Sequence, residues 1–248
     1  SRLIDLGKAP VKPLSKDPAS IGPRQIGLAR NVPALKLNSE TSKRLEWKSL
    51  PSGGLVGSLG IQSKGALGLR LGLRVHEIPD SAEVRFFTAD GAEIFLVTGR
   101  EISEAIKKNL AAGDPEETAR LYWSPILTGE GVGIEIFLPG DTPATEVDIS
   151  IPEVSHLYED PAAANPQSLQ PRGSSAYCEV DAMCYPDWLG TSNSVALIPY
   201  IQNGNSYLCT GTLLNDQASD GVPYFLTANH CINNQTAAST VTPYWFVY

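Results

Sequence analysis

Between residues 67 and 76, apolar residues alternate strictly with polar or small residues. One series is Leu67, Leu69, Leu71, Leu73 and Val75, and the other is Gly68, Arg70, Gly72, Arg74 and His76. A period of two places successive side chains on opposite faces of a strand. We therefore expect a half-buried β-strand here, with His76 exposed on its polar face.

A β-hairpin is expected directly after this strand. Residues 83–88 and 92–97 have the composition of strands, and the dipeptide Asp90-Gly91 joins them. We expect a two-residue turn there, because such turns need positive φ at both central positions and favour Asp-Gly.

One helical segment interrupts the strands. Ile102, Ile106 and Leu110 recur at four-residue spacing, and Gly113 offers a stop signal. A second short helix is expected to begin at Asp114, which would serve as its N-cap and is followed by a proline suited to the first turn.

Short strands separated by turns predict a β-sandwich over residues 51–159, with a helical insertion near residues 101–120. Residues 1–50 have no firm period and are interpreted as an N-terminal arm. Residues 160–172 contain several prolines and alanines without a period, and are interpreted as an exposed linker of the kind that proteases cut.

Composition changes abruptly at the end of this linker. All 19 Lys and Arg residues lie at or before Arg172, whereas all four Cys residues lie in residues 173–248. This second segment again contains stretches typical of short strands, at 194–202, 206–214 and 222–228. Two compositional breaks at one point predict a domain boundary.

The bulk charge and hydropathy exclude some classes of partner. A net charge of -8 argues against nucleic acid, because no basic patch would outweigh it. No run of residues approaches the roughly 20 apolar residues that a membrane helix requires. We therefore expect neither nucleic acid nor a membrane as a partner.

The candidate chemistry lies in Tyr224–Cys231, with the sequence YFLTANHC. A serine hydroxyl attacks a peptide carbonyl poorly unless a base takes its proton, and imidazole titrates near neutral pH. An apolar strand followed by small residues can hold His230 at the edge of a cleft. Cys231 can tie this segment to the neighbouring strand, where Cys209 is the obvious partner.

This stretch, together with CTGTLLN at residues 209–215, resembles the catalytic-histidine region of chymotrypsin-like serine proteases. It is most similar to bacterial lysyl endopeptidase precursors. The resemblance implies an all-β architecture in two parts. A β-sandwich leader domain precedes the incomplete first β-barrel of a chymotrypsin-like fold, which residues 173–248 supply as the N-terminal part of a trypsin-like protease domain.

The spacing of Gly173, Cys178 and Cys184 is similar to the start of the mature chain in that family. Residues 122–125 and 154–158 resemble segments of its leaders. We therefore interpret Arg172-Gly173 as the processing site, with the leader before it (residues 1–172) and the protease part after it (residues 173–248).

The family resemblance implies a secreted, extracellular serine endopeptidase precursor that cleaves proteins or peptides after Lys, or Arg, without a cofactor. Of the Ser-His-Asp triad, only the general base His230 is expected within this chain. The Asp and Ser are expected beyond Tyr248, so we expect the 248-residue chain alone to be inactive. The leader is expected to pack on the protease part.

Four cysteines allow three pairings. The resemblance implies a Cys209–Cys231 disulfide, and pairs Cys178 and Cys184 with cysteines outside this chain, although a Cys178–Cys184 bridge stays open. The four cysteines with His230 form a poor zinc site, because the first pair lacks the Cys-x-x-Cys spacing and disulfides suit a secreted protein. No metal site is expected.

Two alternative functions stay open. In the first alternative, the chain is a secreted, disulfide-containing β-sandwich binding module. In the second, it is a catalytically inactive protease-like protein in which His230 is structural. His156 follows the last predicted leader strand and is expected to be structural. The missing Lys and Arg in residues 173–248, where the chain average predicts about six, suggest protection from self-cleavage or adaptation to salty or acidic surroundings.

Overall fold

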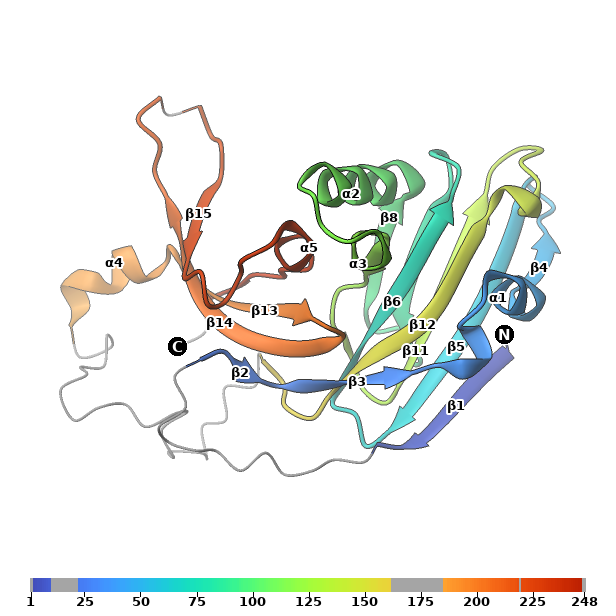
Figure 1. The fold of residues 1–248 in the computed structure, drawn as a ribbon, viewed down its shortest axis with the longest axis horizontal. Helices are drawn as coiled ribbons and strands as arrows, with labels where there is room; N and C mark the ends of the chain where they lie inside the picture. The colour runs from blue at the N-terminus through green and yellow to red at the C-terminus, as the bar shows by residue number, and fades with distance from the viewer. Residues whose placement is uncertain (1, 10–21, 162–184, 219, 247–248) are drawn as a thin grey trace.

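The computed structural model describes residues 2–9, 22–161, 185–218 and 220–246 (Figure 1). Three β-sheets dominate the described residues, and the helices are few and mostly short. The all-β fold class is therefore confirmed. None of the described helices has the length and apolar character needed to cross a membrane.

The first sheet has the strand order β1-β5-β11-β7-β8, and β4 also pairs with β5. Its strands are β1 (Arg2–Lys8), β4 (Glu46–Ser49), β5 (Leu55–Lys64), β7 (Glu83–Thr88), β8 (Ile94–Thr98) and β11 (Gly131–Leu138). The β1–β5 pair is parallel, and the other pairs are antiparallel.

The second sheet has the order β10-β6-β12-β3, and β9 also pairs with β6. Its strands are β3 (Gly27–Asn31), β6 (Gly68–Glu77), β9 (Leu121–Trp123), β10 (Leu127–Thr128) and β12 (Asp148–Leu157). Sheets 1 and 2 enclose the largest apolar core, which includes Leu59, Ile61, Leu71, Phe86 and Ile134. These two sheets form a β-sandwich.

The third sheet has the order β15-β14-β13-β16, and β2 also pairs with β14. Its strands are β2 (Arg24–Gln25), β13 (Val195–Gln202), β14 (Asn205–Leu214), β15 (Tyr224–Thr227) and β16 (Tyr244–Trp245). All of its strands except β2 come from residues 195–245. Figure 1 shows this sheet to one side of the sandwich. The chain passes from sheet 3 at β2 to sheet 2 at β3.

The helices are α1 (Asn38–Arg44), α2 (Gly99–Ala111), α3 (Glu116–Ala119), α4 (Leu189–Ser192) and α5 (Gln235–Ala238). Short 3₁₀ turns lie at η1 (Pro33–Leu35), η2 (Ala144–Glu146) and η4 (Pro186–Trp188). In Figure 1, α5 lies between the β13–β14 hairpin and the corner formed by α2 and α3.

The strand predicted at residues 67–76 is confirmed as β6, but its polar face is not generally exposed. His76 is exposed as expected, whereas Arg70 is only 1% exposed. The reason is that the outer face of sheet 2 contacts residues that follow position 185. The alternating sequence predicts that β6 is buried on one face, but around Arg70 both faces of this strand are covered.

The hairpin predicted at residues 83–97 forms between β7 and β8, but the two-residue turn was wrong. Gly91 has a positive φ of 71°, whereas Asp90 does not have a positive φ. The loop is longer, and the Asp90 carboxylate organises it by accepting hydrogen bonds from Thr88 Oγ1 (2.6 Å) and the Ala92 N–H (3.1 Å). Asp90 acts through its side chain instead of its backbone.

The predicted helix is confirmed as α2, which begins with a capping box formed by Thr98 and Glu101. Ile102 and Ile106 are buried, but Leu110 is 37% exposed and Asn109 is buried in its place. Asp114 was wrongly predicted as the N-cap of the next helix, because α3 has Pro115 at that position and no side-chain cap.

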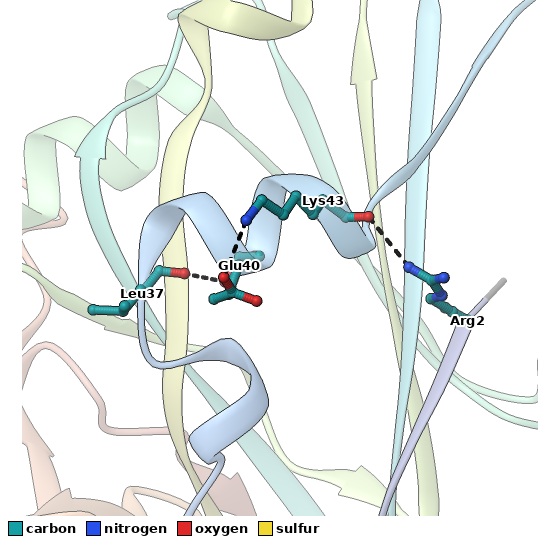
Figure 2. Close-up of polar contacts among 5 residues, drawn as sticks. Arg2, Leu37, Glu40 and Lys43 are labelled. Atoms are coloured by element: carbon teal, nitrogen blue, oxygen red, sulfur yellow. Dashed lines mark hydrogen bonds and ion pairs between the residues drawn. The ribbon is translucent and has the colours of Figure 1, made fainter.

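Several described residues of the predicted N-terminal arm are part of the sandwich, since β1 and β4 pair with β5, and β3 pairs with β12. Helix α1 lies next to β1, and Figure 2 shows the polar contacts that connect them. The Arg2 guanidinium donates to the Lys43 carbonyl over 3.3 Å, and Lys43 pairs with Glu40 over 3.2 Å. The Glu40 N–H in turn donates to the Leu37 carbonyl at the start of the helix.

Candidate active site

His230 lies in a turn directly after β15, and its side chain is exposed. The turn is closed by the Cys231 N–H, which donates to the Ala228 carbonyl over 2.9 Å. β15 itself is held by antiparallel pairing with β14. The imidazole is therefore presented on the surface at the end of a paired strand, and it makes no hydrogen bond to the described residues.

Gly211 on β14 permits the close approach of β15. A Cβ atom at Gly211 would lie 2.7 Å from Phe225 Cζ and 2.8 Å from the Leu226 carbonyl oxygen. The Thr227 hydroxyl donates to the Thr210 carbonyl over 2.9 Å and adds a side-chain contact between the strands. Small residues in both strands thus set the position from which the chain turns toward His230.

A disulfide joins Cys209 on β14 to Cys231 in the turn, with a Cα–Cα distance of 6.2 Å. Cys231 is buried against Tyr200 and Ala237, whereas the neighbouring His230 is exposed. The bond therefore fixes the backbone on the C-terminal side of His230, while β15 fixes the N-terminal side.

The ligand atoms of Cys209, His230 and Cys231 lie within 4.8 Å of one another. Zinc binds cysteine as the thiolate, and both sulfur atoms here are joined in a disulfide. While the disulfide is intact, the His230 imidazole is the one side chain of these three that could bind a metal ion. The disulfide therefore anchors the turn that carries His230.

The segment after His230 continues into α5, which contacts residues of the sandwich. Asn234 caps the helix by accepting a hydrogen bond from the Ala237 N–H over 2.7 Å. The Asp114 carboxylate accepts two more hydrogen bonds, from the Thr236 N–H (2.6 Å) and Thr236 Oγ1 (2.7 Å). Ser239 Oγ donates to Asn109 Oδ1 over 2.5 Å. Asp114 therefore binds α5 and does not cap α3.

Arg70 makes a buried contact with the end of the same segment. Its Nε donates to the Ser124 carbonyl (2.8 Å), and one terminal nitrogen donates to the Thr240 carbonyl (2.7 Å). Burial lowers the pKa of Arg70 to about 10, so the side chain remains a cation at neutral pH. Thr240 Oγ1 also accepts from the Ile201 N–H, which connects this point to β13.

The tip of the β13–β14 hairpin also contacts the sandwich. Its turn residues, Asn203 and Gly204, both have positive φ, as a two-residue hairpin turn requires. Asn205 Oδ1 accepts hydrogen bonds from the Ala29 N–H (3.0 Å) and Gln25 Nε2 (3.2 Å). The hairpin is thus held against β3 as well as paired with β2.

Two small apolar clusters join sheet 2 to sheet 3. One contains Leu121, Trp123 and Ile201. The other contains Ile26, Ile126 and Leu157, with Leu208 and Tyr244 packed against it. Between them, Ser155 and Ser206 are hydrogen bonded through their hydroxyls over 2.8 Å and are completely buried. The contact therefore has both apolar and polar parts.

His156 is completely buried, in agreement with the structural role expected for it. Its Nδ1 is 2.7 Å from Ser63 Oγ, and that hydroxyl also accepts from Arg30 over 2.6 Å. Burial lowers the pKa of His156, and the Arg30 cation lowers it further. A serine and a histidine meet here, but a completely buried pair beside a cation has no access to a substrate.

Of the predicted site residues, Cys209, His230 and Cys231 lie together in the structure. The other predicted site residues, Cys178, Cys184, Arg172 and Gly173, lie outside the described residues.

The sequence did not predict that Arg70 and Asp114 contact the segment after His230, because their partners lie more than 100 residues away in the chain. The Asn203-Gly204 dipeptide is the sequence signal from which the tip of the β13–β14 hairpin could be predicted.

Comparisons with known protein families match two stretches of the chain. Residues 4–158 match the family described as the lysyl endopeptidase N-terminal domain. Residues 172–248 match the family described as the lysyl endopeptidase C-terminal domain. The second match begins at Arg172, where composition changes.

A curated relative, the lysyl endopeptidase of Pseudomonas aeruginosa, is 31% identical to this chain over 250 aligned residues. The alignment covers 96% of this chain and 48% of the relative. The chain therefore spans about half the length of the relative that it matches.

Proposed function

Because this chain belongs to the lysyl endopeptidase family, we propose that it is part of a secreted serine endopeptidase precursor that cleaves peptide bonds after lysine. The observation that carries the proposal is the exposed His230, held between β15 and the Cys209–Cys231 disulfide. An imidazole with fixed backbone on both sides can keep the orientation that proton transfer requires.

In the proposed mechanism, His230 accepts the proton of a serine hydroxyl as its oxygen attacks the scissile carbonyl. The imidazolium then gives this proton to the leaving amine, and an aspartate holds the ring in the required orientation. We propose that the Ser and Asp lie in a part of the full-length protein outside these 248 residues, which span about half the length of the relative.

The leader is proposed to assist folding of the protease part and to keep the enzyme inactive until cleavage at Arg172-Gly173. The contacts of sheet 2 and α2 with α5 and the β13–β14 hairpin support this proposal. The basic residues support it too. An enzyme that cleaves after Lys or Arg finds sites throughout the leader and none in residues 173–248.

The test of the catalytic proposal is fluorophosphonate labelling of the full-length secreted protein. Such probes react with a serine only when a base activates it. We expect labelling of the wild type, loss of labelling in His230→Ala, and normal labelling in the control His76→Ala, which alters an exposed leader histidine. Equal labelling of His230→Ala would contradict the role of His230. No labelling of correctly processed wild type would favour an inactive or binding protein.

Lysine specificity and the processing site need separate measurements. Matched peptide amides that end in Lys or Arg are expected to be hydrolysed with a preference for Lys. An Arg172→Gln precursor is expected to be processed more slowly or at another bond, as mass spectrometry of the mature N-terminus would reveal. Processing at the same bond and rate would overturn the assignment of Arg172.

A further inference from the structure

Contacts with the sandwich hold β14, which carries Cys209, and α5, which begins four residues after Cys231. We propose that the leader directs formation of the Cys209–Cys231 disulfide by fixing β14 and α5 on one surface. The inference rests on the proposed division into leader and protease part, but not on catalysis.

The first point of attachment is on β14, three residues before Cys209. The Ser206 hydroxyl is 2.8 Å from the Ser155 hydroxyl of β12, and the Ser206 carbonyl accepts the Ile26 N–H over 2.8 Å. Ser155 and Ser206 are both completely buried. Since β14 is continuous between Ser206 and Cys209, these contacts limit where the Cys209 thiol lies.

The second point of attachment is on α5, five residues after Cys231. The Asp114 carboxylate accepts the N–H and the hydroxyl of Thr236, at 2.6 and 2.7 Å. Arg70 adds a buried hydrogen bond to the Thr240 carbonyl over 2.7 Å. A charged partner strengthens each of these hydrogen bonds, so the helix is held at both ends.

The residues that make these contacts belong to a well-packed platform. Arg70 and Ser155 lie on paired strands of sheet 2, whose other face packs into the large core of the sandwich. Asp114 follows α2, which the buried Ile102 and Ile106 anchor. A rigid surface that positions both cysteine-bearing segments raises the effective concentration of one thiol near the other.

The described residues from position 185 onward contain little apolar core of their own. Their buried apolar side chains are few: Ala196, Ile198, Tyr200, Ile201, Cys231 and Ala237. Leu213, Leu214, Tyr224 and Leu226 around the β14–β15 hairpin are more than 40% exposed. The chain also contains Cys178 and Cys184, so wrong pairings compete. We therefore expect contacts with the leader to influence which cysteines form a disulfide.

The chemistry needs an external oxidant, which we take to be a small-molecule disulfide such as oxidised glutathione. One cysteine thiolate attacks it to give a mixed disulfide, and one glutathione thiolate leaves. The second cysteine thiolate then attacks the protein sulfur and releases the second glutathione. The two thiols lose two electrons and two protons, and oxidised glutathione is reduced to two thiols.

The experiment follows oxidative refolding of the reduced 248-residue chain in a glutathione buffer, with cysteine pairing mapped by mass spectrometry of quenched samples. We expect Asp114→Ala to form the Cys209–Cys231 bond roughly tenfold more slowly than the wild type, because two charge-assisted hydrogen bonds are lost. Glu117→Ala is the matched control, since Glu117 is an exposed carboxylate in α3 that has no partner among the described residues.

A second variant tests the other point of attachment. Ser155→Ala is nearly isosteric, keeps the strand pairing of β12, and removes the hydroxyl that contacts Ser206. It is also expected to slow native pairing, and it decides the question if Asp114→Ala does not fold. Wild-type rate and pairing in folded Asp114→Ala and in Ser155→Ala would overturn the proposal. Disulfide mapping is independent of fluorophosphonate labelling, so the two proposals fail separately.

Discussion

Replacement of Gly211 by alanine tests whether close contact between β14 and β15 sets the position of the His230 turn. The new methyl group would lie 2.7 Å from Phe225 Cζ and 2.8 Å from the Leu226 carbonyl oxygen. Ordinary contacts between carbon atoms are about 3.5–4.0 Å. Both neighbours would therefore have to move by several tenths of an ångström or more.

Neither movement is free of cost. The Phe225 ring packs edge-on against Trp245, with ring centroids 6.0 Å apart. The Leu226 carbonyl belongs to the backbone opposite Thr212 in the β14–β15 ladder. Overpacking of this kind costs about 1–3 kcal/mol. We expect Gly211→Ala to lower the free energy of unfolding by about 2 kcal/mol.

The assay is urea unfolding of the 248-residue chain, together with the rate at which dithiothreitol reduces Cys209–Cys231. Gly211→Ala should have a lower unfolding midpoint and faster reduction. Gly190→Ala is the control, because a Cβ atom there meets nothing within 4 Å. If Gly211→Ala has the stability and reduction rate of wild type, then close strand contact does not hold the turn and the reasoning is refuted.

Three further changes test other parts of the structure. The double variant Cys209→Ser, Cys231→Ser removes a disulfide with a sequence separation of 22 and should cost about 3 kcal/mol in urea unfolding. Ile201→Ala empties a buried contact between sheets 2 and 3 and should cost about 3 kcal/mol, measured in the same way; no loss would mean that this cluster adds nothing. Because the pKa of His156 is lowered in the folded state, the unfolded chain binds a proton more readily. Stability should therefore fall as the pH drops below about 6.5, and His156→Gln should lose this dependence if the buried imidazole causes it.

The sequence predicts local features of this fold well. The alternation at residues 67–76 and the run at 83–88 correspond closely to β6 and β7, because period and composition reflect one buried face. The stretches 209–215 and 224–231 likewise indicate where His230 and the neighbouring disulfide lie, because the residues that form them are concentrated in these two short stretches.

Long-range contacts were not predictable from these patterns. Arg70 occupies a position that alternation assigns to solvent, and its burial depends on Thr240, 170 residues later. Asp114 has the residue type and spacing of a helix cap, but its carboxylate binds Thr236, 122 residues later. In both cases, the local rule gives the wrong environment for the side chain, because packing of a distant segment determines what it contacts.

The pairing of β2 with β14 has a kinetic consequence for the proposed precursor. Arg24 and Gln25 precede the expected cleavage point, yet they form part of the sheet that Cys209 belongs to, and the next N–H, from Ile26, donates to Ser206. Scission of the chain at Arg172 would leave these backbone hydrogen bonds intact. Cleavage of the chain and dissociation of the leader would then be separate events. The lifetime of the cleaved complex would depend on how fast β2 separates from β14.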